Sequence, residues 1–442
     1  MQAEQLVELL HCLEVDLCWL GVADNLMMNP IRGSLILFVL ILAPLLSGCR
    51  GRGQDPTGTW TGTFRNPSGE LVAYTLVVTA PGGAYQGSWQ NGEELIPSTA
   101  GGSWDGRTLR LPFDYYDGEL VVTIEGDRLQ GAFTRQWQRQ SLIRQLEGRR
   151  GAPPTGRVAG GQSLTGDWVL AVGAPPNQRY WRASFQQEGA GLLGTLITVS
   201  GDWGSFTGRV DGEEFALSRF DGINSRLLKG RVRADGRFEG IVDLGLFDPV
   251  RPVVGERLDP GNQQSVANLP DPDNYTRVVN PAEPFRFAFP SLAAQMVSST
   301  DERFRDKVVV ISITGSWCPN CHEESPLLQQ YYQKYGPRGL EVVGLAFEYT
   351  GEADRDLEQL RIFAARHQLT YPLLLAGTTD DGEIGRKLPQ LVNFAAYPTT
   401  IFVGRDGLVR RIHTGFEGRA TGERHRRLKA DYEALIEQLL SE

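Results

Sequence analysis

Two hydrophobic patterns divide this chain of 442 residues. Between residues 50 and 262, short runs of alternating apolar and polar positions are separated by turn pairs such as Asn91-Gly92 and Asp211-Gly212. Alternating runs joined by such pairs are typical of antiparallel β-hairpins. From residue 284 onward, continuous apolar runs of strand length alternate with segments of helical periodicity. That order is typical of a largely parallel sheet covered by helices, so the pattern predicts an all-β region followed by an α/β domain.

The β-rich region repeats itself. Thr57-Gly58-Thr59-Trp60 is echoed by Thr165-Gly166-Asp167-Trp168, and the two tryptophans are 108 positions apart. This period predicts two modules, residues 50–150 and 160–262, each with about seven or eight antiparallel strands. Closed or nearly closed barrels fit best, and a sandwich is the alternative. The tryptophans of the region are expected in the core rather than around a ligand cavity: Trp60, Trp89, Trp104, Trp168, Trp181 and Trp203.

A stretch rich in Pro, Asp and Asn at residues 263–283 lacks periodicity and predicts a linker. Beyond it, residues 284–442 predict one further domain. Strands are expected from Phe285 to Phe289 and at 307–314, 340–347, 371–375, 401–403 and 408–413, with helices at 323–335, 357–367 and 423–440. This order of elements predicts a thioredoxin-like α/β fold, with a central mixed sheet and helices on both faces.

The candidate chemistry lies between the first buried strand and the first helix of that domain, at Cys318-Pro319-Asn320-Cys321. The positive end of a helix and its unpaired N–H groups stabilise a thiolate at Cys318. Pro319 suits the first helical turn because no N–H is needed there. Cys321 lies one turn further, close enough to attack a mixed disulfide formed at Cys318. The motif therefore favours thiol–disulfide exchange.

Two other uses of a cysteine pair fit the sequence less well. Half of a zinc site would need a second pair, and His322, which is expected on the helix surface, cannot alone complete four ligands. A structural disulfide across so short a loop would constrain the unfolded chain little. We therefore expect no metal, and no cofactor other than the redox-active pair Cys318 and Cys321.

The N-terminal segment predicts where the protein works. Arg32 precedes an apolar run, Leu35 to Leu46, which is too short to span a bilayer that needs about 20 residues. The run ends in Leu46-Ser47-Gly48-Cys49, which resembles a bacterial lipobox and makes Cys49 the expected site of lipid attachment. Residues 27–49 are therefore predicted to be a lipoprotein signal peptide. The protein is expected in the bacterial periplasm or cell envelope, anchored to a membrane by lipid.

Residues 1–26 contain acidic residues but no Lys or Arg, the wrong sign for the start of a signal peptide. We expect this leader to be mis-assigned, with translation beginning at Met27 or Met28. The exported chain would then keep only Cys318 and Cys321 as thiols, because Cys49 would be acylated. An exported protein that uses no other cysteine is using this pair for chemistry.

Several residues of the segment 284–442 resemble the TlpA/ResA family of membrane-tethered, thioredoxin-like disulfide reductases. They are Trp317-Cys318-Pro319-Asn320-Cys321, the following Glu324 and Pro326, and Tyr397-Pro398-Thr399. The resemblance implies a protein disulfide reductase with Cys318, Cys321 and Glu324 as catalytic residues. It also implies a cis Pro398, with substrate bound along Trp317, Pro319, Tyr397, Pro398 and Thr399.

Glu324 follows Cys321 by three positions on the same helix face. If it is partly buried, its raised pKa would let it exchange a proton with Cys321. Thioredoxin itself carries an acid six positions before its first cysteine. That position is Ser312 here, so the task falls to Glu324.

The resemblance further implies a membrane electron donor of the DsbD or CcdA type. It implies protein disulfide substrates, possibly those of apocytochrome c. The formal net charge of −9 argues against nucleic acid as a partner. A peroxiredoxin-like thiol peroxidase is an alternative. Such enzymes resemble one another in carrying a Thr three positions before the reactive cysteine. That position is Gly315 here, so this alternative is disfavoured. A ligand-binding lipoprotein with the redox domain as accessory is the other alternative.

Overall fold

The computed structural model describes residues 55–137, 140–152, 162–245, 250–259 and 269–442. These residues fall within one compact unit, Gln54–Glu442. The predicted leader, the signal peptide and Cys49 lie outside the described residues. No helix in the described part of the chain combines the length and the apolar composition needed to cross a membrane.

The first β module is a nine-stranded antiparallel sheet in the order β4-β3-β2-β1-β9-β8-β7-β6-β5. An isolated bridge between Tyr85 and Gly102 joins the two edges, so the sheet is nearly closed. Its strands are β1 (Gly58–Arg65), β2 (Leu71–Thr79), β3 (Gln86–Asn91), β4 (Glu94–Pro97), β5 (Ser103–Trp104), β6 (Thr108–Phe113), β7 (Gly118–Glu125), β8 (Arg128–Trp137) and β9 (Gln140–Arg150).

The second β module is a closed barrel, because β11 pairs with both β10 and β12. Its order is β11-β10-β18-β17-β16-β15-β14-β12-β13. The strands are β10 (Gly166–Val172), β11 (Arg179–Glu188), β12 (Gly191–Thr198), β13 (Gly201–Asp202), β14 (Phe206–Asp211), β15 (Glu214–Phe220), β16 (Ser225–Val232), β17 (Phe238–Asp243) and β18 (Arg251–Arg257). The prediction of two antiparallel β modules is confirmed: the second is a closed barrel, whereas the edge strands β4 and β5 of the first do not pair.

Individual side-chain contacts also repeat between the two β modules. The Trp60 indole N–H donates to the Pro56 carbonyl at 2.9 Å, and the Trp168 indole donates to the Leu164 carbonyl at 2.8 Å. An arginine from the last strand of each module lies over the same ring, at 4.3 Å in the first module and 4.7 Å in the second. Both tryptophans are buried, so they are core residues as predicted.

The C-terminal domain has a five-stranded sheet in the order β24-β23-β22-β26-β27. Strands β22 (Val308–Thr314), β23 (Leu340–Glu348) and β24 (Leu373–Thr378) are parallel, and β26 (Thr399–Val403) and β27 (Val409–Thr414) complete the sheet in antiparallel fashion. Two short pairs lie beside it: β19 (Arg277–Val278) with β25 (Leu391–Val392), and β20 (Ala288–Pro290) with β21 (Met296–Ser298). This is the predicted thioredoxin-like arrangement.

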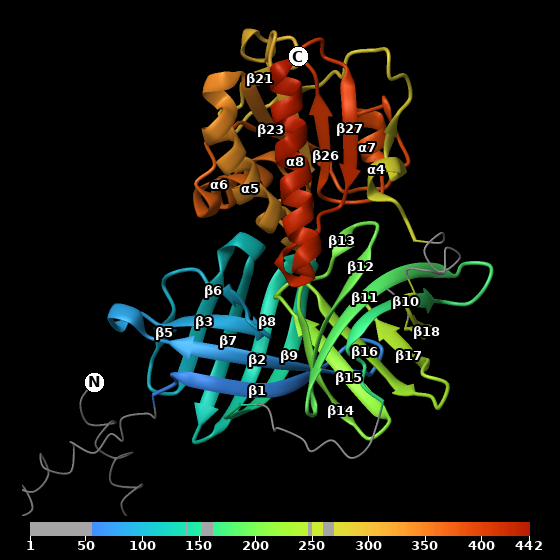
Figure 1. The fold of residues 1–442 in the computed structure, drawn as a ribbon. Coiled ribbons are helices and arrows are strands. Elements are labelled where there is room, and N and C mark those ends of the chain that lie inside the picture. The colour runs from blue at the N-terminus through green and yellow to red at the C-terminus, as the bar shows by residue number, and fades with distance from the viewer. Residues whose placement is uncertain (1–54, 138–139, 153–161, 246–249, 260–268) are drawn as a thin grey trace, which may run out of the picture. The chain divides into compact units, whose positions relative to one another are not determined.

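Both faces of the sheet are covered, but unequally. Figure 1 shows helices α5 (Pro319–Tyr335), α6 (Ala353–His367) and α8 (Glu423–Ser441) beside the sheet. Buried side chains of all three belong to one hydrophobic cluster with Val308 and Val310 of the central strand. The alternate side chains of that strand, such as Ile311, pack on the opposite face against the segment that precedes the sheet and the short helix α7 (Glu383–Lys387). A further short helix, α4 (Pro272–Tyr275), lies before the domain.

One predicted strand differs from the structure. The sequence predicts a strand from Phe285 to Phe289, but only the end of this segment belongs to β20. Phe285, Phe287 and Phe289 are nevertheless all buried in the same cluster. The alternation in the sequence therefore reflects burial of one side of an extended segment, not pairing along its whole length. The predicted domain boundaries stay predictions, because the described residues form a single compact unit.

Candidate active site

The two cysteines lie where the central strand meets its helix. Strand β22 ends at Thr314, and Cys318 is the N-cap residue of α5, with Pro319 in the first turn. The backbone N–H of Cys321 donates to the Cys318 sulfur at 3.3 Å. This bond places an N–H donor and the positive end of the helix against the Cys318 sulfur. Both cysteines are free thiols.

Cys321 is completely buried. Burial raises the pKa of the Cys321 thiol well above its usual range, and the hydrogen bond with Cys318 acts in the same direction. A thiol in this environment is a poor spontaneous nucleophile and needs help to lose its proton. The two cysteines are therefore chemically unequal, with one at the helix cap and the other in the core.

Glu324 is buried with no exposed surface, one turn along the helix from Cys321. The Ser312 hydroxyl donates to its carboxylate at 2.6 Å, and the Thr400 hydroxyl donates to the other oxygen. Burial raises the pKa of Glu324, although these two hydrogen bonds oppose the rise. Ser312 occupies the position where thioredoxin carries its acid, so the helix supplies here the carboxyl group that the strand lacks.

The loop before β26 lies against the reactive sulfur. The Cys318 thiol donates to the Tyr397 carbonyl at 3.4 Å, and the Tyr397–Pro398 peptide bond is cis, as the resemblance implies. The rings of Tyr397 and Trp317 meet at 5.2 Å between centroids. Thr399 is fully buried and donates from its hydroxyl to the Ala396 carbonyl, so its side chain supports the loop from inside.

Glu348 is a site residue that the sequence alone did not single out. It ends strand β23 and accepts hydrogen bonds from both the backbone N–H and the hydroxyl of Ser316, at 2.8 and 2.6 Å. Burial raises its pKa to about 8, although these hydrogen bonds act against the rise. Glu348 lies at the carboxyl end of a buried parallel strand, beside the strand that leads to the cysteines. This position in the sequence could have identified it as a site residue.

His322 does not lie on the helix surface, as the sequence predicts, but is partly buried between the helix and the first β module. Its Nε2 contacts the Ser316 carbonyl at 2.8 Å, and its Nδ1 lies 2.7 Å from Nε2 of His367. The rings of Tyr115 and Tyr116 lie edge-on to it. Burial lowers the pKa of His322 well below its usual value and that of His367 to about 4, so both are neutral at pH 7.

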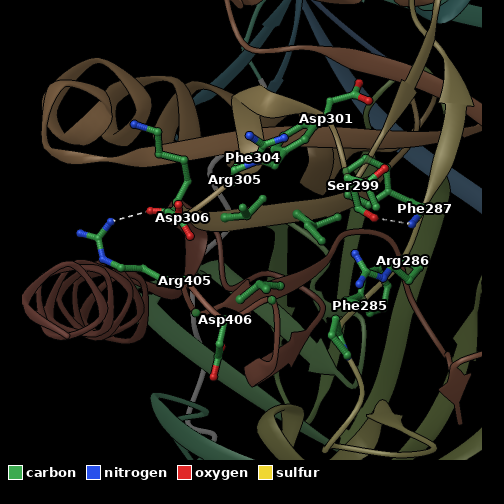
Figure 2. Close-up of a pocket in the computed structure, with 18 residues that line it drawn as sticks. Phe285, Arg286, Phe287, Ser299, Asp301, Phe304, Arg305, Asp306, Arg405 and Asp406 are labelled. Atoms are coloured by element: carbon green, nitrogen blue, oxygen red, sulfur yellow. Dashed lines mark hydrogen bonds between the residues drawn. The ribbon is translucent and has the colours of Figure 1, made fainter.

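Several cavities lie in or beside the domain. A cleft of about 280 Å³ is lined by Phe285, Phe304 and Asp406, among others, and Figure 2 shows these side chains around it. It lies at the start of β22, whereas the cysteines follow the end of that strand, so it is not the redox site. A larger recess of about 690 Å³ is lined by Pro319 and Asn320. Within the described residues, no group of three or more metal-binding side chains is arranged to hold an ion.

Fold and site together define a class. A strand that delivers a CxxC pair to a helix cap, a buried acid behind the second cysteine and a cis-proline loop against the first are the parts of a thioredoxin-like thiol–disulfide oxidoreductase domain.

Comparisons with known proteins agree with that class and make it more specific. Residues 282–412 match the model of the AhpC/TSA family. The thioredoxin-like protein YneN of Bacillus subtilis is 26% identical over 129 residues, which are 29% of this chain and 68% of that protein. The thiol-disulfide oxidoreductase ResA of Geobacillus kaustophilus is 28% identical over 122 residues, which are 28% of this chain and 63% of ResA. The resemblance of the C-terminal segment to the TlpA/ResA reductases is thus confirmed.

The chain spans about two thirds or less of the length of most of these relatives. Among solved structures, a thiol:disulfide interchange protein of the thioredoxin family from Chlorobium tepidum has a TM-score of 0.27 and 20% identity. The match covers 36% of this chain and 98% of that one. A secreted thiol-disulfide isomerase from Corynebacterium glutamicum has a TM-score of 0.30 and 17% identity, covering 39% of this chain and 97% of that chain. No inference about function rests on these two structures.

Proposed function

We propose that this protein is an extracytoplasmic, lipid-anchored thiol–disulfide oxidoreductase that reduces protein disulfides through Cys318 and Cys321. The observation that carries the proposal is the hydrogen bond from the Cys321 backbone N–H to the Cys318 sulfur at the first turn of α5. It prepares one sulfur as the nucleophile and holds the second within reach of it.

The reaction proceeds in two exchanges. The Cys318 thiolate attacks one sulfur of a substrate disulfide, forms a mixed disulfide and releases the other substrate sulfur as a thiolate. The Cys321 thiolate then attacks the Cys318 sulfur and releases the remaining substrate thiolate. The substrate gains two electrons and, from solvent, two protons, while the enzyme is left with a Cys318–Cys321 disulfide. A dithiol or membrane donor returns two electrons to that disulfide.

Glu324 is proposed to take the proton of Cys321 before the second exchange and to return it when the disulfide is reduced. Its carboxyl and the Cys321 thiol are buried in the same helix turn, and burial raises the pKa of both groups. A carboxylate whose pKa is raised by burial is a stronger base than an exposed one, so it accepts the thiol proton more readily.

Substrate is proposed to lie along the cis-proline loop. Tyr397 and Trp317 flank the Cys318 sulfur, and Pro319 is partly exposed beside it. Pro398 has no N–H and a fixed φ, which leaves an edge for a substrate backbone. Thr399, buried beneath, is proposed to hold the loop in place rather than to touch the substrate.

Location and partners rest on the sequence. A signal peptide at 27–49 with lipid on Cys49 would place the protein in the periplasm or cell envelope, attached to a membrane. An exported reductase must be re-reduced from the membrane, which supports a donor of the DsbD or CcdA type. Apocytochrome c and other exported proteins with mispaired cysteines are the proposed substrates.

The test uses the reduced full chain with a chromogenic small disulfide and with insulin, in the presence of dithiothreitol. The protein is expected to accelerate reduction of the small disulfide, and Cys318→Ser is expected to abolish this acceleration because it removes the attacking sulfur. Cys321→Ser is expected to accumulate mixed disulfides that mass spectrometry identifies. The proposal is wrong if Cys318→Ser reduces the small disulfide as fast as the unaltered protein does.

A further inference from the structure

The attacking sulfur is covered. Cys318 is only 4% exposed, although a thiol that exchanges with a substrate disulfide must be reached by that disulfide. A folded substrate protein is rigid around its disulfide, so it can bring that disulfide to Cys318 only if the surface around the sulfur is open. What surrounds the sulfur therefore decides which disulfides can reach it.

The second β module packs against the active-site motif. Its segment Val199–Ser205, here called the cover loop, contains the two-residue strand β13 and contacts the motif between the two cysteines. The Asn320 side-chain amide donates to the carbonyls of Ser200, at 3.1 Å, and Asp202, at 2.9 Å. Asn320 thus fastens the cover loop to the first turn of α5.

Backbone contacts fasten the cover loop to the redox domain as well. Gly201 forms a parallel bridge with Phe416, and the Asp202 backbone N–H donates to the Phe416 carbonyl at 3.1 Å. The Asp202 carboxylate accepts from the Gly418 N–H at 2.5 Å. These bonds continue the strand pairing from the barrel onto the segment that follows β27.

The approach is close enough to demand glycine. A Cβ on Gly201 would lie 1.9 Å from the Phe416 carbonyl oxygen, and the φ of Gly201 is +89°. Any side chain at this position would push the cover loop away from Phe416. The seal is therefore built from backbone against backbone, which leaves no room for a substrate chain.

The cover loop is also held by side chains of the barrel. Arg226 of β16 lies over the Trp203 ring at 4.1 Å, and the Trp203 indole donates to the Ser200 hydroxyl at 3.4 Å. The loop that meets Asn320 is therefore supported from within its own module.

The geometry points to the cover loop as a specificity-determining element of the oxidoreductase. In the closed arrangement, small disulfides reach Cys318 through minor side-chain movement, whereas a folded protein disulfide reacts only after the cover loop has detached. This inference rests on the proposed function, because it concerns which disulfides the same thiol accepts. The 690 Å³ recess beside Pro319 and Asn320 does not include Cys318 in its lining, so the recess alone gives no folded partner access to the thiol.

Two glycine substitutions test this. Gly201→Ala brings a methyl group against Phe416 and opens the cover. Gly212→Ala is the matched control, because Gly212 also has a positive φ, +63°, in the same module, but a methyl group added there would have no other atom within 4 Å. Single-turnover rates with insulin and with the small disulfide are measured for each full-length variant.

Gly201→Ala is expected to raise the insulin rate at least about fivefold, the change that corresponds to losing about 1 kcal/mol of closure. The small-disulfide rate should change little, and Gly212→Ala should match the unaltered protein with both probes. Equal changes with both probes in Gly201→Ala, or no change with either, overturn the inference. Failure of the unaltered protein with the small disulfide would instead refute the proposed function.

A second measurement needs no cover variant. The reduced unaltered protein is labelled with N-ethylmaleimide and with a bulky polyethylene glycol maleimide, and labelling at Cys318 is followed by peptide mapping. The small reagent is expected to react much faster than the bulky one in the folded protein, with similar rates after denaturation. Similar rates in the folded protein would contradict a cover over the thiol.

Discussion

At the scale of single residues, the site depends on carboxyl groups held away from water. Glu324 and Glu348 are both almost completely buried, and each accepts hydrogen bonds from hydroxyl groups. One lies behind Cys321 and the other beneath the turn that carries Ser316. Burial raises the pKa of both groups, that of Glu348 to about 8, which suits proton transfer in one case and pH-dependent stability in the other.

Glu324→Gln keeps the size of the side chain and can still bond Ser312 and Thr400, but it cannot accept a proton. We expect the second exchange, in which Cys321 releases the substrate, to slow about tenfold to a hundredfold. Stopped-flow decay of a preformed mixed disulfide measures that step. Glu358→Gln, an exposed change on α6, serves as the control and should leave the rate unaltered. An unchanged rate in Glu324→Gln would remove Glu324 from the mechanism.

Glu348→Gln should change how stability depends on pH. The folded-state pKa of about 8 lies above the usual value of 4.5, so the folded state binds more protons than the unfolded state between these pH values. Stability contributed by the neutral carboxyl is therefore present below about pH 4.5 and is lost as pH rises through about 8. The variant is expected to be more stable than the unaltered protein at pH 9, by about 5 kcal/mol, and similar at pH 4.5. Urea unfolding at the two pH values checks this, and an equal difference at both would contradict it.

At the scale of elements, the repeat gives each β module the same anchor. Trp60 and Trp168 are each fixed by an indole hydrogen bond to a carbonyl four residues earlier, beneath an arginine from the last strand. The anchor joins the entry of the first strand to the end of the last one, which closes each module at the same point. The two modules therefore use the same set of contacts at the same place, although their sequences differ at most positions.

Trp60→Phe and Trp168→Phe are expected to destabilise the protein by similar amounts, about 1–3 kcal/mol each. Each change leaves a buried carbonyl without its donor and a small cavity beside the ring. Denaturant unfolding followed by circular dichroism measures both costs. A large cost in one module with none in the other would show that the shared contacts do not have a shared role.

Local patterns predicted some elements well, and the reason is physical. The strand before Cys318 and the helix after it follow from apolar runs, proline and helix periodicity within about twenty residues. The placement of Glu324 follows from helix geometry alone. Asn320 and Glu348 could not be assigned in this way, because their partners are brought by tertiary folding. Ser200 lies in a different module, and Ser316 is separated from Glu348 by a whole helix.

At the scale of the whole molecule, the two β modules and the redox domain share buried contacts within one unit. Asn91 of the first module exchanges two hydrogen bonds with the backbone of Phe220 in the second, at 2.9 and 3.2 Å. Arg355 of α6 forms an ion pair with Asp117 of the first module. These contacts hold the β modules against the domain that carries Cys318, which is the arrangement that the proposed cover loop requires.

The position of Phe220 has a consequence for how such a chain can change over time. Its ring enters the core of the first module and meets Trp89 at 4.7 Å and Phe64 at 4.9 Å, so the second copy completes the interior of the first. The two modules are therefore complementary rather than interchangeable. Neither can be exchanged for the other, and a larger ring at one of these three positions has to be matched by a smaller one at another. Substitutions at this contact therefore have to occur in both modules together.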